Sequence, residues 1–211
     1  MKNLLKRYIY FMIGIMINSF GIAFITKSAL GTSQISSVPY VLSLQFYKIS
    51  FGQWTFVLNM LFIIGQIILL KKQFHPIQFL QIPANIMFSG LIDVSMNLLK
   101  MFHPTGIGIR FVSMIFGCMI LAFGIVVEVA PNVITVPGEG IVKALSIKTK
   151  IKFGTVKVYF DITLIIIAAI LSFIFFGKLR GVGIGTICSA ICVGRFVNII
   201  RKNCKFIKVY Q

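Results

Sequence analysis

Four carboxylates are the residues of this chain best suited to chemistry, because each lies inside or beside a long apolar stretch. They are Asp93, Glu128, Glu139 and Asp161, and the 211 residues contain no other acid. A carboxylate held in hydrocarbon costs about 2.5–3.5 kcal/mol and is rarely kept without a partner or a role. Carboxylates bind cations, accept protons or pair with lysine, so these four positions are the first candidates for function.

The fifth apolar stretch offers an ion pair. Lys157 and Asp161 are four residues apart, so they share one face of a helix and can form a salt bridge. The matching positions in the first half of the chain, Thr55 and Asn59, are polar but uncharged. We expect the charged pair either to sense a substrate or coupling ion, or to be structural, with the lysine only neutralising the acid.

A polar stripe runs along the third apolar stretch. Its members recur every four residues and therefore share one helical face: Gln81, Asn85, Ser89, Asp93 and Asn97. On a lipid-facing surface these side chains would find neither water nor partners, so the stripe is expected to face the bundle interior or a cavity. The alternative is hydrogen bonding between helices without any passage.

The elements that must position these residues are membrane spans. The chain is 58% hydrophobic, and its apolar runs reach the length of roughly 17–25 residues that crosses a bilayer. We therefore predict an all-α, polytopic membrane protein. The six expected spans are residues 8–26, 53–70, 78–98, 109–129, 157–177 and 181–200.

The two halves of the chain, residues 1–104 and 105–211, are related in sequence. Each half holds three predicted spans, and an odd number of spans inserts the second half upside down relative to the first. The sequence thus predicts an inverted repeat with a site between its halves, or else a duplicated helical bundle that transports nothing. Gly14, Met16, Ile17, Phe20, Gly21 and Ile22 recur in register as Gly117, Met119, Ile120, Phe123, Gly124 and Ile125.

A long connection with a short apolar segment follows the first span of each half, at residues 27–52 and 130–156. We expect a re-entrant or interfacial half-helix in each, preceded by Gly31-Thr32-Ser33 in one and by the run containing Gly138 and Glu139 in the other. The N–H groups at such helix starts would bind an anionic group, unless the Glu139 side chain takes that place itself. The alternative places Glu139 at a helix start on a cytoplasmic surface loop.

The 21 lysines and arginines concentrate at the ends of apolar stretches, where they report orientation rather than a nucleic-acid partner. Most of them gather on one side if the N-terminus is cytoplasmic, which predicts that both termini are cytoplasmic. The chain has no paired-histidine motif and no nucleophile elbow, and its cysteines lack a metal-ligand spacing such as two close pairs. We therefore expect no enzyme activity, no metal and no cofactor.

Motifs in both halves resemble the YczE/YyaS/YitT family of bacterial integral membrane proteins. The first half carries Ala29-Leu30-Gly31-Thr32-Ser33 and Gly52-x-Trp54-Thr55-Phe56, and the second Pro137-Gly138-Glu139-Gly140 and Gly181-Val182-Gly183-x-Gly185-Thr186. The resemblance covers nearly the whole chain. It implies a bacterial cytoplasmic membrane location and a duplicated helical fold, but it supplies no substrate.

Together these features predict a secondary transporter, or permease, for a small polar solute. The alternative is an accessory or regulatory membrane protein that transports nothing. The expected partners are the lipid bilayer, an unknown small solute and a coupling ion, and the sequence indicates no oligomeric state. Residues expected to line or gate the path are Asn18, Gly31, Thr32, Ser33, Asn59, Asn85, Ser89, Asp93, Glu128, Gly138, Glu139, Lys157 and Asp161.

A reporter fused to the C-terminus tests the orientation. Because positive charges are retained on the cytoplasmic side, we expect a fluorescent-protein fusion to be active and an alkaline phosphatase fusion to be inactive. A fusion at Lys100, in a predicted outer loop, is the control and should give the opposite pattern. Phosphatase activity at the C-terminus would contradict the predicted topology.

Overall fold

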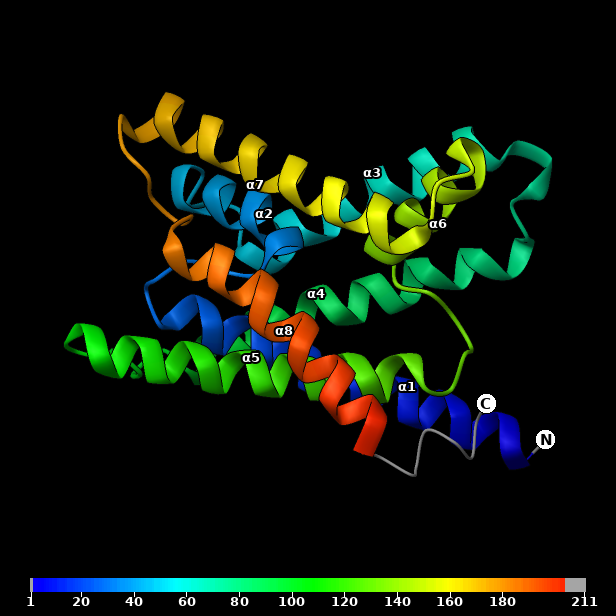
Figure 1. Cartoon of the computed structure of the whole chain (residues 1–211), viewed down its shortest axis with the longest axis horizontal. Coiled ribbons are helices and arrows are strands. Elements are labelled where there is room, and N and C mark those ends of the chain that lie inside the picture. Colours follow the sequence, from blue (N-terminus) through cyan, green and yellow to red (C-terminus); the bar gives the residue numbers. More distant parts are fainter. Residues whose placement is uncertain (1, 204–211) are drawn as a thin grey trace.

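The computed structural model describes residues 2–203, and in that range the backbone forms helices joined by short connections and no strand (Figure 1). Residues 204–211, which include the C-terminus, lie outside the described range. The helices are α1 Lys2–Lys27, α2 Gln34–Gln45, α3 Phe51–Leu70, η1 Lys71–Gln73, η2 Pro76–Leu80, α4 Gln81–Leu98, α5 Ile107–Val129, α6 Pro137–Thr149, α7 Phe153–Phe176 and α8 Ile184–Asn203.

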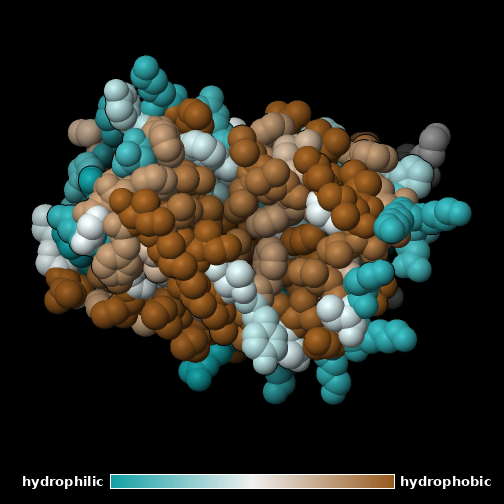
Figure 2. All heavy atoms as spheres, turned by 90° about the horizontal axis from the view of Figure 1, so that it is seen from above, coloured by the Kyte–Doolittle hydropathy of each residue, from teal (hydrophilic) through white to brown (hydrophobic). Residues whose placement is uncertain are grey.

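Six of the described helices are long and apolar enough to cross a membrane: α1, α3, α4 together with η2, α5, α7 and α8. The predicted all-helical fold with six helices of spanning length is therefore confirmed. Apolar side chains cover the middle of the face that contains α7, and hydrophilic side chains gather at its margins (Figure 2). This distribution suits a protein that passes through a membrane several times.

The two short helices lie inside the bundle rather than along its edge. In Figure 1, α2 and α6 begin near the middle of the molecule and run towards opposite ends. Helix α2 packs against α7, and α6 packs against α3. Their starts are neighbours, since a Cβ atom added to Gly138 would lie 3.0 Å from Ile35 Cδ1.

The backbones of α1 and α5 approach each other closely along their whole contact. A Cβ atom added to Gly21 would lie 2.6 Å from the backbone of Leu121, and one added to Gly124 would lie 2.5 Å from the Asn18 nitrogen. Gly14 against Glu128 and Gly117 against Ile25 are equally tight. Small residues allow such an approach between membrane helices, so these four glycines set the α1–α5 distance.

The start of α8 docks on the connection that precedes α2. The Gly185 nitrogen donates to the Leu30 carbonyl over 2.9 Å, and a Cβ atom on Gly183 or Gly185 would collide with Leu30. Gly31 has a φ of 137°, a backbone conformation that favours glycine. These contacts tie the first half of the chain to the last helix.

Substituting a packed glycine and an unpacked one tests the α1–α5 contact. Gly124→Ala should lower the free energy of unfolding by about 1–3 kcal/mol, because its methyl group meets the Asn18 backbone. Gly194→Ala on α8 is the control: nothing lies within 4 Å of its added Cβ atom, so the gain in helix propensity should leave stability unchanged or raise it by up to about 1 kcal/mol. Equal unfolding midpoints of the two purified variants in detergent would contradict this packing.

Candidate functional site

The buried carboxylate of Glu128 pairs with an amide on α1. The Asn18 Nδ2 donates to Glu128 Oε2 over 2.6 Å, and the two residues are 8% and 3% exposed. The bond is possible because Gly14 and Gly124 bring the two backbones together at this level. Both residues were candidates from the sequence, but their contact joins distant parts of the chain and was not predicted.

The counterpart of this pair in the sequence repeat is apolar. Ile25 corresponds to Glu128 and Leu121 to Asn18, and both belong to a buried hydrophobic cluster. The α1–α5 interface is therefore polar towards the start of α1 and apolar towards its end. The buried acid of this interface, Glu128, lies near the end of α5 and faces the middle of α1.

Lys157 and Asp161 form the ion pair that their spacing predicted. The Lys157 Nζ lies 2.6 Å from Asp161 Oδ1, and the two side chains are 25% and 20% exposed. A fully exposed pair of this kind contributes little stability, but here most of each side chain is shielded from solvent. The pair lies in the first turns of α7. Both of its charges interact electrostatically with Glu139 of α6.

Glu139 lies in the first turn of α6 with its side chain partly buried. Burial raises the pKa of its carboxyl group above the usual value, the nearby cations Lys157 and Arg201 lower that pKa, and Asp161 raises it. Glu139 therefore faces charges on α7 and α8. It is not an isolated charge on an exposed loop.

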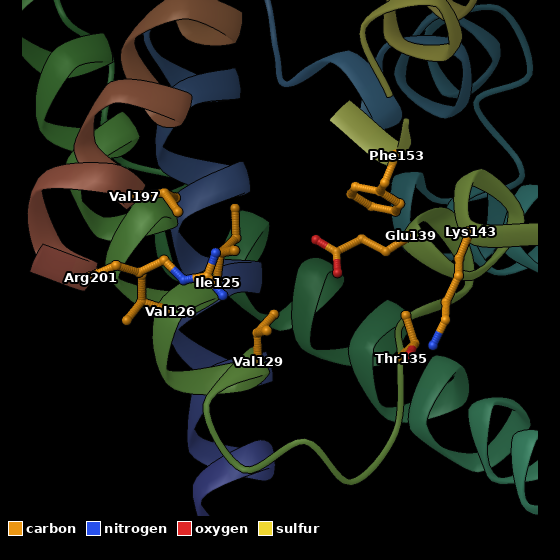
Figure 3. A pocket seen from close by; sticks show the side chains of 9 residues that line it. All are labelled: Ile125, Val126, Val129, Thr135, Glu139, Lys143, Phe153, Val197 and Arg201. Atoms are coloured by element: carbon orange, nitrogen blue, oxygen red, sulfur yellow. The ribbon is translucent and has the colours of Figure 1, made fainter. Parts of the chain in front are cut away.

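A cavity of about 300 Å³ opens beside Glu139, between α5, α6 and α8 and the start of α7 (Figure 3). The Glu139 carboxylate points into it, and the Arg201 side chain extends into it from α8 towards Ile125. Its walls are mostly aliphatic, with Phe153 above the carboxylate. The lining residues are Ile125, Val126, Val129, Thr135, Glu139, Lys143, Phe153, Val197 and Arg201.

The two cations of this cavity were missed as site residues. Lys143 and Arg201 were interpreted only as part of the charge pattern that sets orientation, and nothing in their spacing distinguishes them from the other basic residues. Lys143 and Thr135 also border a second cavity of about 350 Å³ on the side of α3 and η2. The segment that carries Thr135 thus separates two hollows at the same end of the bundle.

The predicted anion-binding run before α2 is largely engaged by the protein. The Thr32 nitrogen donates to Thr186 Oγ1 over 3.2 Å, and Ser189 Oγ donates to the Thr32 carbonyl over 3.3 Å. Ser33 stands at the N-cap of α2 but donates its hydroxyl proton to Ser36 Oγ instead of capping the helix. The first N–H groups of α2 therefore receive no side-chain cap from Ser33.

Two buried amides lie at the starts of the short helices. Gln66 of α3 donates to the Pro137 carbonyl over 3.3 Å, and a Cβ atom on Gly140 would meet its amide at 2.5 Å. Gln34, the first residue of α2, buries its side-chain nitrogen with no partner among the described residues. The start of α6 thus has the Gln66 amide beside it, and the start of α2 carries the Gln34 amide.

The polar stripe of α4 bonds mainly to α3. Gln81 exchanges hydrogen bonds of 3.2 Å with Gln66, and Asn85 Oδ1 accepts from Asn59 Nδ2 over 2.8 Å. Asp93 accepts from the Gly52 nitrogen over 2.8 Å and from Ser50 Oγ, so it stabilises the start of α3 as a helix-end anion.

This geometry matches the alternative interpretation of the stripe, hydrogen bonding between helices. Ser89 donates to Asn85 Oδ1 over 3.4 Å. Ser89 and Asp93 also border a shallow hollow of about 310 Å³ between α3 and α4. Asn97 is exposed, so the expectation that the stripe faces the interior along its full length is wrong at that end.

A double substitution tests the buried Asn18–Glu128 pair. Asn18→Leu introduces the residue found at the matching position of the second half and removes the donor to a buried carboxylate, so stability should fall by about 1–3 kcal/mol. Adding Glu128→Ile converts the pair into its apolar counterpart and should recover most of that loss. The measurement is the unfolding free energy in mixed micelles.

The exposed Asn97→Leu is the matched control and should have little effect. If the double variant is less stable than Asn18→Leu alone, the carboxylate is stabilised by something other than Asn18, and the inference from this bond is wrong.

Comparison with known proteins identifies a family. No curated protein and no solved structure matches the chain. A family described as a family of unknown function (DUF6198) matches residues 5–202, which is nearly the whole chain and includes every candidate site residue named above. The protein therefore belongs to the DUF6198 family.

Proposed function

We propose that this protein is a secondary transporter of a small polar solute in the bacterial cytoplasmic membrane. The observation that carries the proposal is the meeting of the α2 and α6 starts inside the bundle, next to a cavity that reaches Glu139 of α6. Interrupted helices whose N-terminal ends point to a common interior region are typical of transporter sites. Such helix ends offer N–H groups and a positive dipole end to a bound solute.

The glycine contacts support an inverted repeat. Gly14 packs on Glu128 while its counterpart Gly117 packs on Ile25, the counterpart of Glu128. The contact between Gly21 and Leu121 is matched in the same way by that between Gly124 and Asn18. Contacts that are reproduced when two halves are exchanged are the mark of a two-fold relation.

The packing of the short helices follows the same exchange. Helix α2 of the first half packs on α7 of the second, and α6 of the second half packs on α3 of the first. Each short helix is thus covered by a long helix from the other half of the chain. This interlocked arrangement would let the halves rock about the shared region, which exposes a central site to either side in turn.

The charged residues give the transport path a direction. Glu128, Glu139, Asp161 and Lys157 lie towards one end of the bundle, and the predicted topology makes this end cytoplasmic. The cavity beside Glu139 lies at that end. In the proposed mechanism this arrangement would be an inward-facing state.

The alternative, an accessory membrane protein, is favoured by one observation. The polar stripe of α4 is largely used in hydrogen bonds to α3, as a purely structural stripe would be. The two functions differ in whether the region around the α2 start is ever reached by water from both sides. That difference can be measured without knowing the solute.

Accessibility of a cysteine at the α2 start tests the proposal. In a chain whose four native cysteines are replaced by alanine, Ser33→Cys should react with a membrane-impermeant thiol reagent in both right-side-out and inside-out vesicles. The reason is that alternating access exposes the site to each side in turn. Ala122→Cys, buried in the α1–α5 contact, is the control and should react from neither side.

Reaction from neither side at Ser33→Cys would favour the accessory protein. Reaction from one side only would indicate a fixed cavity without alternation. Either result would overturn the transport proposal.

A further inference from the structure

We propose that the cavity between α5, α6 and α8 binds a small monocarboxylate with a hydrocarbon body, with its carboxylate on Arg201, and that Glu139 takes up one proton with each anion. This inference rests on the proposed transport function, because it names the substrate class and the coupling ion of the proposed transporter. It makes the protein a symporter of protons and short organic acids. The argument depends on the walls of the cavity, its cations and the position of its one acid.

The walls select an apolar body. Val126, Val129 and Val197 surround the hollow together with Ile125, and the Phe153 ring covers one side (Figure 3). A volume of about 300 Å³ is at the lower limit of small-molecule pockets, so the ligand must be small. Inorganic phosphate would place several of its oxygens against these hydrocarbon walls without donors, which is costly.

The cations select a carboxylate. The Arg201 side chain lies along the cavity and ends near Ile125, where its planar guanidinium can bind both oxygens of a carboxylate. Lys143 adds a second positive charge on the opposite side, next to Thr135. An organic acid can place its carboxylate against the Arg201 cation of α8 and its hydrocarbon part among the valines.

Glu139 is the one acid lining this cavity and decides when an anion can bind. As a carboxylate it would repel the ligand and compete for Arg201, whereas as a carboxylic acid it is neutral and can donate a hydrogen bond. Burial, with the charge of Asp161, already raises its pKa, and a bound anion would raise it further. The charged groups that face it are Lys157 and Asp161 of α7, Arg201 of α8, Glu128 of α5 and Lys143 of its own helix.

The sign of the pH dependence follows from this coupling. Because the protonated form of Glu139 favours the anion, affinity is full below the pKa of Glu139 and falls as pH rises through and beyond it. One linked proton limits the fall to about tenfold per pH unit. No covalent step is involved: one proton and one anion enter from the same side and leave together.

Equilibrium binding of 4-methylpentanoate to the full chain in lipid nanodiscs tests the proposal. Titration calorimetry between about pH 6 and 8, where a simple carboxylate stays ionised, should show weaker binding at each higher pH. Glu139→Gln, which mimics the protonated acid, should bind the probe with an affinity that no longer depends on pH. A wild-type affinity that is flat across this range, or a Glu139→Gln variant that keeps the wild-type slope, would overturn the proton role.

Substitution of the cation tests the carboxylate contact. Arg201→Gln should weaken binding about tenfold or more at every pH, because a charge-assisted bidentate contact is lost. Arg195→Gln, exposed on the same helix outside the cavity, is the matched control and should bind as the wild type does. Equal affinities of the two variants would overturn the assignment of Arg201.

Two further probes distinguish the ligand classes. Leucine differs from 4-methylpentanoate by an amino group, so tighter binding of leucine, abolished in Glu139→Gln, would show that Glu139 binds an ammonium and overturn the proton role. Displacement of 4-methylpentanoate by millimolar inorganic phosphate would overturn the apolar selectivity.

Vesicle uptake separates this inference from the proposed function. Suppose that the probe binds with the expected pH dependence but is not taken up into proteoliposomes under a proton gradient. That result would overturn the proposed transport function and would still support the monocarboxylate site. If Ser33→Cys reacts from both sides but the probe does not bind, the monocarboxylate site is overturned and the proposed transport function still stands.

Discussion

The close packing of α1 against α5 is the contact on which the rest of the structure depends. Lipid chains are as apolar as leucine, so membrane helices associate through van der Waals packing that small residues make possible. Gly14, Gly21, Gly117 and Gly124 provide that packing, and α4 and α8 attach to the outer sides of the pair. The place of the buried acid and the α5 and α8 walls of the cavity are therefore set by four residues without side chains.

A second constraint, the satisfaction of polar groups away from water, explains how the remaining helices are arranged. The amides of α4 form hydrogen bonds with α3, Thr186 Oγ1 accepts a hydrogen bond from the Thr32 nitrogen, and Gln66 donates to the backbone of α6. Interrupted backbone at membrane depth is tolerated only where protein or a cavity surrounds it. In the proposed transporter fold, the short helices α2 and α6 meet this condition because α7 packs on α2 and α3 packs on α6.

The sequence allowed the local parts of this structure to be predicted. The six spans follow from apolar length, the short helices from the glycine-containing connections, and the Lys157–Asp161 pair from a spacing of four residues on one helix. The Asn18–Glu128 bond could not be predicted, since it depends on how α1 packs against α5. The place of Arg201 in the cavity wall was not predicted for a different reason: a cation near the end of a span is ordinarily explained as an orientation signal.

The Asn18–Glu128 bond also bears on whether the two proposed repeats are equivalent. Its two residues lie in different halves, and the matching positions, Leu121 and Ile25, are both apolar. Two identical halves facing each other would carry either two such bonds or none. In the proposed inverted repeat the two halves are therefore not interchangeable, and two copies of either piece would not reproduce this bond.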